Sequence, residues 1–177
     1  MTDGSLVSAR LLVFRVGTLA CAAEVDQVRE ILPRLPTTRI PGALPAVAGL
    51  VNVRGTLVTV VEGWRALGQS APSNPAAPSP SESEPDTGST IILELPHDGA
   101  RDDGSRRVIG FTVDEVIDML AAGDATLEER QALPGVDPML VRAVGRLKRA
   151  GEGGQAVGRE LFIVLDVAAL LGPILTS

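Results

Sequence analysis

The sequence is poor in the side chains that most often carry chemistry. Its 177 residues include one cysteine, Cys21, and one histidine, His97. A single cysteine excludes an internal disulfide and, with one histidine, leaves a zinc site almost without ligands. Nucleophilic catalysis needs a base beside the nucleophile, but Cys21 lies in an apolar run and His97 in a polar one. We therefore expect no enzyme, no bound metal and no cofactor.

Aromatic residues and basic charge are also scarce. Aromatics make up 2% of the chain and hydrophobic residues 45%, so aliphatic side chains must fill the core. The formal net charge of −6 gives no general attraction to nucleic acid or to an anionic membrane. No apolar run approaches the roughly 20 residues that span a bilayer, and the amino terminus lacks the basic start of a secretory signal. We expect a cytoplasmic protein without a nucleic-acid partner or direct membrane insertion.

The central feature of the sequence is a pair of apolar, β-branched runs within residues 46–62. They meet at residues 52–55 with no proline between them, which predicts a β-hairpin. Gly55 can adopt the positive φ of a tight turn. Arg54 is the only charged residue between positions 39 and 62. Two roles stay open for it: a solvated turn residue, or a cation held on a rigid rim to meet a partner.

Apolar runs elsewhere predict a mainly β protein. Residues 24–32 and 114–121 fit either a bent strand or a short helix, and the four prolines of residues 33–45 predict an irregular connection. We expect strands at residues 11–17, 19–23, 90–95, 106–113, 140–147 and 160–166, a short turn or edge strand at 126–133, and helical turns at 64–68 and 167–171, the last one ending before Gly172.

Two segments of the chain are expected to lack fixed structure. Residues 69–89 are rich in serine, proline, alanine and acidic residues and contain no large apolar side chain. This composition predicts a flexible loop. Residues 1–9 are expected to be a disordered amino terminus.

An internal repeat organises the chain. Residues 25–32 align with residues 113–120 without a gap, and residues 55–68 align with residues 159–172 in the same order. A unit of about five short strands is thus used twice, which suits a small barrel without open edges. Two such barrels bury little alone, so we expect them to share a hydrophobic interface, with a groove between them as the binding site.

The remaining polar residues fit structural roles. Asp26 and Asp114 occupy equivalent places in the repeat and are expected to be turn or backbone-capping residues rather than an acid/base pair. The acidic clusters at residues 82–86 and 102–103 lack the spacing of a calcium loop. A run of basic residues without interleaved aromatics predicts a solvated strand face rather than a nucleic-acid platform: Arg142, Arg146, Lys148 and Arg149.

Several segments, taken in order, carry a resemblance to a known family. They are Phe14 to Gly17, residues 28–32, Ile40 with Pro41, residues 49–55, residues 109–116, and Leu165 with Asp166. In their order and spacing they resemble the CheW-like family, the adaptor proteins of bacterial chemosensory arrays. The resemblance spans nearly all of residues 10–172.

The resemblance implies both a fold and a role. The fold would be a single domain of two intertwined five-stranded SH3-like β-barrels with short helical turns and no catalytic activity. One surface would dock the regulatory domain of a CheA-type histidine kinase, and another would grip the cytoplasmic tip of a chemoreceptor, a methyl-accepting protein. The family's receptor-binding positions fall on Val28, Glu30, Gly49 and Arg54.

The chain departs from the family pattern after the central hairpin. Where the family usually has Val-Asp-Leu-Arg, this sequence has Val61, Glu62, Gly63, Trp64 and Arg65. Kinase docking is therefore less strongly implied than receptor docking. One alternative is a divergent accessory protein that binds the receptor but not the kinase. An alternative of another class is a small-molecule-binding barrel, against which the lack of convergent polar groups argues.

Overall fold

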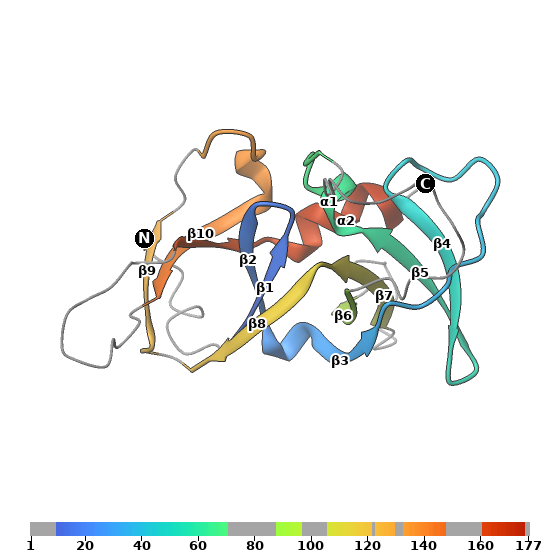
Figure 1. Cartoon of the computed structure of the whole chain (residues 1–177), viewed down its shortest axis with the longest axis horizontal. Coiled ribbons are helices and arrows are strands. Elements are labelled where there is room, and N and C mark those ends of the chain that lie inside the picture. The colour runs from blue at the N-terminus through green and yellow to red at the C-terminus, as the bar shows by residue number, and fades with distance from the viewer. Residues whose placement is uncertain are drawn as a thin grey trace, which may run out of the picture.

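The computed structural model describes residues 10–70, 88–96, 106–121, 123–129, 133–147 and 161–175. Most of these residues lie in strands, and the short helices follow the hairpins (Figure 1). In chain order the elements are β1 (Leu11–Val16), β2 (Leu19–Glu24), the 3-10 turn η1 (Val25–Gln27), β3 (Val28–Pro33), β4 (Val47–Val53), β5 (Thr56–Glu62), α1 (Gly63–Ala66), β6 (Ser89–Pro96), β7 (Arg106–Val113), β8 (Glu115–Leu120), β9 (Ala125–Glu129), the 3-10 turn η2 (Pro138–Leu140), β10 (Val141–Leu147), β11 (Leu161–Leu165) and α2 (Val167–Leu175).

The strands expected from the sequence are confirmed, and the ambiguous segments are resolved. Residues 24–32 contain both a helical turn, η1, and a strand, β3, whereas residues 114–121 give the strand β8. The charged segment after residue 124 is an edge strand, β9. The expected disordered amino terminus, residues 71–87 of the expected loop and the acidic clusters lie outside the described residues.

The expectation that the last helix ends before Gly172 is wrong. Helix α2 continues to Leu175 and contains Pro173. A proline in a helix removes one backbone hydrogen bond. Leu170 and Leu171 are buried in the core, and Ile174 packs against it. Tertiary packing therefore holds the last turn, because the stability of short helices comes mainly from such contacts.

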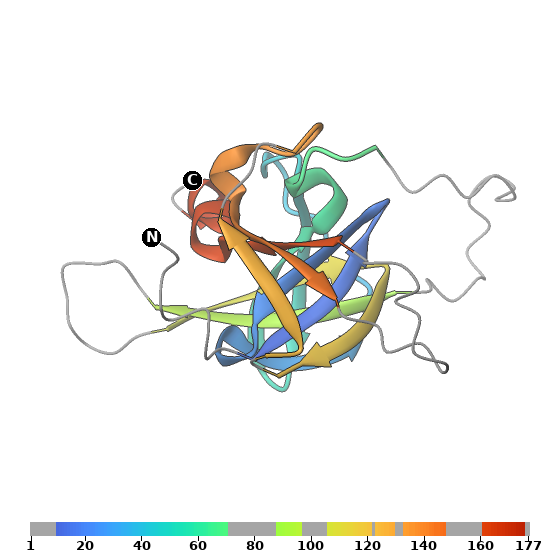
Figure 2. The ribbon, with the colours of Figure 1, turned by 90° about the vertical axis from the view of Figure 1, so that its left-hand side faces the viewer.

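Each of the two sheets combines strands from both halves of the chain. The first has the order β8-β1-β2-β11-β10-β9, and the second has the order β3-β6-β7-β5-β4. Figure 2 shows the blue β1–β2 hairpin from the start of the chain beside the orange and red strands from its end. The intertwined arrangement is therefore confirmed. The first sheet has six strands rather than the expected five, because β9 pairs with the outer edge of β10.

Equivalent strands of the two sheets pair through equivalent residues. In the parallel pair β5–β7, Val60 lies opposite Gly110, and in the parallel pair β11–β2, Val164 lies opposite Ala22. The sequence repeat aligns Val60 with Val164 and, by the same offset as residues 25 and 113, Ala22 with Gly110. The β-bulges also recur, in β1–β8 and β3–β6 and in β10–β11 and β4–β5. Such agreement is what a duplicated structural unit predicts.

The largest hydrophobic cluster lies between the sheets and takes residues from both. Phe14 of β1 and Phe111 of β7 meet edge to face there, with ring centroids 6.1 Å apart. We call this set the central cluster. Each sheet also encloses a smaller cluster of its own, around Phe162 in the first sheet and Val58 in the second. The three phenylalanines thus occupy the most buried positions, where their large area contributes most to stability.

A glycine and a phenylalanine in the first sheet form a matched pair. A Cβ added at Gly145 would lie 2.1 Å from the ring of Phe162, which is fully buried. By the shared register, the equivalent pair in the second sheet is Val51 and Val58. The first sheet therefore pairs a phenylalanine with a glycine where the second sheet pairs two valines.

We expect this pair to behave as one packing unit. Gly145→Val alone should lower the free energy of unfolding by about 2–4 kcal/mol, because the new side chain collides with the ring. Phe162→Val alone should cost a similar amount, roughly 2–4 kcal/mol, because it leaves a cavity. The double variant should lose clearly less than the sum of the two. Chemical denaturation of the four proteins measures the coupling, and strictly additive losses would contradict it.

Candidate functional site

The turn of the β4–β5 hairpin has an unusual residue in a constrained position. Arg54 and Gly55 both have positive φ, at 50° and 86°, between the paired residues Val53 and Thr56. Two successive positive φ values are typical of a type I′ turn, which favours asparagine or glycine at these places. Within the described residues, Arg54 is the only non-glycine residue with positive φ. The main-chain N–H of Gly55 donates to Oδ1 of Asn52 at 2.7 Å, which stabilises the turn.

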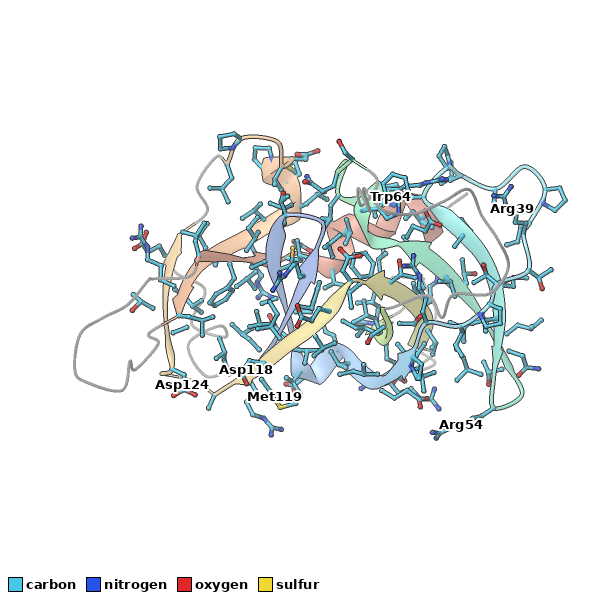
Figure 3. All side chains as sticks on the ribbon, in the orientation of Figure 1. Arg39, Arg54, Trp64, Asp118, Met119 and Asp124 are labelled. Carbon is cyan, nitrogen blue, oxygen red and sulfur yellow. The ribbon has the colours of Figure 1, made fainter. Side chains whose placement is uncertain are left out.

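The Arg54 guanidinium is exposed but oriented. Its side chain is 80% exposed, and its Nη2 lies 3.0 Å from Oε2 of Glu30 on β3, whose side chain is only 18% exposed. Figure 3 shows Arg54 at the free tip of the hairpin. An exposed ion pair adds at most about 1 kcal/mol to stability. Arg54 is therefore a solvated turn residue, and Glu30 holds its cation at the rim of the hairpin.

A small cavity lies beside this ion pair. Its volume is about 50 Å³, and its lining includes Arg29, Glu30 and Arg54 with Val58 and Ile92. Pockets that bind metabolites usually measure roughly 300–1,000 Å³. This cavity has room for water but not for a substrate, so it gives no support to the small-molecule alternative.

Val28 lies on the same strand as Glu30 but faces the other way. A β-bulge separates them, so that Val28 pairs with Leu93 and Glu30 pairs with Ile92. Leu93 belongs to the central cluster and Ile92 to the small cluster of the second sheet. Neighbouring residues of a strand point to opposite faces. The structure thus brings Glu30 and Arg54 together and places Val28 against the central cluster.

Gly49, the fourth predicted site residue, is buried in β4. Its φ is 152°, and an added Cβ would lie 2.2 Å from the carbonyl oxygen of Thr38. Thr38 and Leu50 exchange two backbone hydrogen bonds of 2.8 Å beside it. Gly49 therefore allows the irregular segment after β3 to approach β4 closely, and it presents no side chain to a partner.

Sequence reasoning missed three apolar residues on the edge strands β3 and β8. Ile31 and Met119 are 41% and 53% exposed, and each pairs with a residue of the central cluster. Val116 packs against the same cluster, as Val28 does. The repeat aligns residue 28 with 116 and residue 31 with 119, and this alignment could have found them. We call the four residues the edge-strand set: Val28, Ile31, Val116 and Met119.

The expectation of a solvated basic face on β10 is wrong for its two described arginines. Both are partly buried and ion-paired: Arg142 with Glu24 of β2, and Arg146 with Glu128 of β9, where Nε and Oε1 are 3.3 Å apart. The Arg146 pair joins β10 to its neighbour β9, and the Arg142 pair links β10 to β2, which lies on the far side of β11 in the sheet. Lys148 and Arg149 lie outside the described residues.

The remaining polar expectations concern capping and metal binding. Asp114 acts as a capping residue, because its Oδ2 accepts a 2.6 Å hydrogen bond from the main-chain N–H of Gly17 and so fixes the β1–β2 turn. Its counterpart Asp26 is exposed in η1. Within the described ranges, no group of three or more His, Cys, Asp or Glu residues could hold a metal ion. All helices in those ranges fall far short of the length of a membrane span.

Cys21 packs as an apolar residue in the central cluster, as the sequence predicted. Burial raises the pKa of its thiol to about 12. Only the thiolate reacts with alkylating reagents, so at pH 8 we expect labelling of the folded protein to be slower by about a thousandfold than labelling of the unfolded chain. Iodoacetamide kinetics with and without denaturant measure the ratio. Fast labelling of the folded protein would contradict the burial.

The arrangement defines a class of fold. Two intertwined, curled sheets with small inner clusters and a shared central cluster form a double SH3-like barrel. The barrels present an oriented cation at a hairpin tip and apolar side chains on two edge strands.

Comparison with known proteins identifies the family. The CheW-like domain family matches residues 10–173, so the chain belongs to this family. A chemotaxis protein CheW from Rhizobium meliloti (strain 1021) is 29% identical over 143 residues, which cover 81% of this chain and 78% of that protein. A probable chemotaxis protein CheW from Rhizobium etli is 24% identical over 160 residues, covering 90% and 85%. The crystal structure of the scaffolding protein TtCheW from Thermoanaerobacter tengcongensis has a similar fold, with a TM-score of 0.64 at 17% identity, covering 93% of this chain and 88% of that one.

Proposed function

We propose that this chain is a non-catalytic, cytoplasmic adaptor of a chemosensory array. It would couple the cytoplasmic tip of a chemoreceptor to the regulatory domain of a CheA-type histidine kinase. Membership of the CheW-like family supports this role, and the relatives that match the chain are named as chemotaxis proteins. The receptor-binding residues would be Val28, Glu30 and Arg54, with Gly49 shaping β4.

The conformation of Arg54 is the observation that carries the proposal. An arginine with positive φ lowers the stability of the fold by roughly 1 kcal/mol or more. The ion pair with Glu30 raises the stability by at most a similar amount. A residue that breaks a local rule without a gain in stability points to function. Arg54 is thus best explained by a contact outside the chain.

Strand β3 combines the two kinds of contact that such a site needs. It carries Glu30, which orients Arg54, and also Val28 and the exposed Ile31. Apolar contacts at an interface supply most of the affinity, and a fixed charge at the rim sets orientation and specificity. A helical receptor tip placed along β3 would meet both.

Helix α1 supports a second candidate, an accessory protein that binds the receptor without the kinase. An added Cβ at Gly63 would lie 2.3 Å from the carbonyl oxygen of Thr112, so the leucine of the family pattern does not fit here without a shift. Trp64 carries the guanidinium of Arg65 over its ring, 4.7 Å from the centroid. The surface that follows β5 therefore differs from the family pattern.

Two binding measurements test the proposal. The purified chain is titrated by calorimetry with a cytoplasmic fragment of its cognate chemoreceptor and, separately, with the regulatory domain of the cognate kinase. Binding to both supports the coupling adaptor, and binding to the receptor fragment alone supports the accessory protein. Binding to neither would overturn the assignment.

A further inference from the structure

The two sheets differ at one edge. In the first sheet, β9 pairs along β10, with Glu128 opposite Val144. In the second sheet, the place of β9 is taken by an isolated bridge, in which Thr38 lies opposite Leu50. The shared register makes Leu50 the counterpart of Val144, and so Thr38 the counterpart of Glu128. Strand β9 pairs with the outer edge of β10 over five residues, whereas only Thr38 pairs with the outer edge of β4.

A proline explains why the equivalent strand stops. In β9 the pairing continues from Glu128 to Thr126, which lies opposite Arg146. The same register places Pro36 at the position of Thr126 and Asn52 at the position of Arg146. Proline has no N–H with which to extend a ladder. The segment before Thr38 therefore cannot pair with β4 as β9 pairs with β10.

The outer edge of β4 is consequently open near the turn. Leu50 directs both its N–H and its C=O to Thr38, and alternate residues of a strand direct these groups to the same side. The N–H and C=O of Asn52 thus point to the outer edge. In the described part of the chain no residue bonds to them. Figure 1 shows this end of the hairpin projecting beyond the segment that crosses β4.

Charge indicates what would occupy this edge. Arg54, two residues beyond Asn52, is bound at Nη2 by Glu30 but is 80% exposed, so its other N–H groups face solvent. In the first sheet, the strand at the corresponding edge supplies Glu128, whose carboxylate binds Arg146. An open edge is a ready template for strand addition. We propose that the outer edge of β4 at Asn52 accepts an extended segment of a partner protein, antiparallel to β4, with an acidic side chain beside Arg54. This surface shares Arg54 with the proposed receptor site, but its backbone contact at Asn52 lies outside that site, so exchange at Asn52 tests this proposal separately from the receptor assignment.

A short peptide tests the proposal on the full-length chain. The probe is a blocked pentapeptide, Thr-Val-Glu-Val-Thr, whose third residue would lie opposite Arg54 and whose fifth would lie opposite Asn52, so that it ends before Thr38. Saturating peptide should slow hydrogen exchange of the Asn52 amide by at least about tenfold, because that amide gains a bond. A control peptide that is N-methylated at the fifth residue cannot donate to the Asn52 carbonyl and should bind at least about fivefold more weakly.

The side chain of the partner is tested separately. Replacing the glutamate of the peptide with glutamine, or Arg54→Asn in the protein, should each weaken binding by about threefold to tenfold. Unchanged exchange at Asn52 with the peptide bound would overturn the proposal. Protection of Asn52 in the peptide-free protein that rises together with dimer formation in sedimentation would overturn it too, because the occupant would then be a second copy of the chain.

Discussion

Arg54→Glu is expected to weaken binding to the receptor fragment by at least about tenfold, which corresponds to about 1.4 kcal/mol. The substitution reverses the charge at the hairpin tip and places a second carboxylate beside Glu30. Calorimetric titration with the receptor fragment measures the loss. The matched control is Arg39→Glu, which makes the same charge change at an exposed position in the segment after β3. It should change the affinity by less than about threefold, since a distant surface charge is screened by salt.

Arg54→Asn separates binding from folding. Asparagine followed by glycine is the favoured pair for this turn, so this variant should raise the free energy of unfolding by about 0.5–1 kcal/mol. It also removes the cation, so affinity should fall nearly as far as in Arg54→Glu. A variant that loses both stability and affinity would mean that Arg54 acts by supporting the hairpin rather than by touching the partner.

Gly49→Ala is expected to lower the free energy of unfolding by roughly 2–4 kcal/mol. The new Cβ would meet a backbone oxygen, that of Thr38, which cannot rotate away as a side chain can. Urea denaturation followed by circular dichroism measures the change. The control is Gly172→Ala, where an added Cβ has no neighbour within 4 Å and φ is not positive. Because Gly172 lies in α2, its replacement should be neutral or stabilising by up to about 1 kcal/mol.

The Gly49→Ala variant also shows whether Gly49 contributes directly to receptor binding. The structure buries Gly49 under Thr38, so any loss of receptor affinity should accompany the loss of stability and should shrink when the fold is stabilised. An alanine variant that is as stable as the wild type but fails to bind would show instead that the partner approaches Gly49 directly.

Local sequence patterns were sufficient to predict most of the strands. Runs such as residues 56–62 are apolar and β-branched, and glycines or prolines mark where they end. The intertwined arrangement came from the family resemblance. The sixth strand of the first sheet was predicted only as a short turn or edge strand, because the charged residues after position 124 do not reveal that they pair with β10. The continuation of α2 through Pro173 depends on packing that no local rule contains.

The site was predictable only in part, because its geometry depends on bulges and distant pairs. Nothing local indicates that the bulge in β3 turns Val28 and Glu30 to opposite faces. Composition alone suggested that the basic residues of β10 are solvated, whereas Arg142 finds Glu24 at a separation of 118 residues. The exposed Met119 escaped notice, although the repeat already aligned it with Ile31.

The exchange of strands between the halves of the chain determines when each sheet can form during synthesis. In the first sheet, β11 joins β2 to β10, so the β1–β2 hairpin, which is synthesised first, gains its parallel neighbour only after β11, the last described strand, has been synthesised. Contacts between residues so far apart slow folding. The early β1–β2 hairpin meanwhile carries an uncovered edge on which other chains could assemble. A gene truncated before β11 would therefore leave the first sheet divided into β8-β1-β2 and β10-β9. The second sheet would keep its strands but lose α2, which packs on the cluster between the sheets.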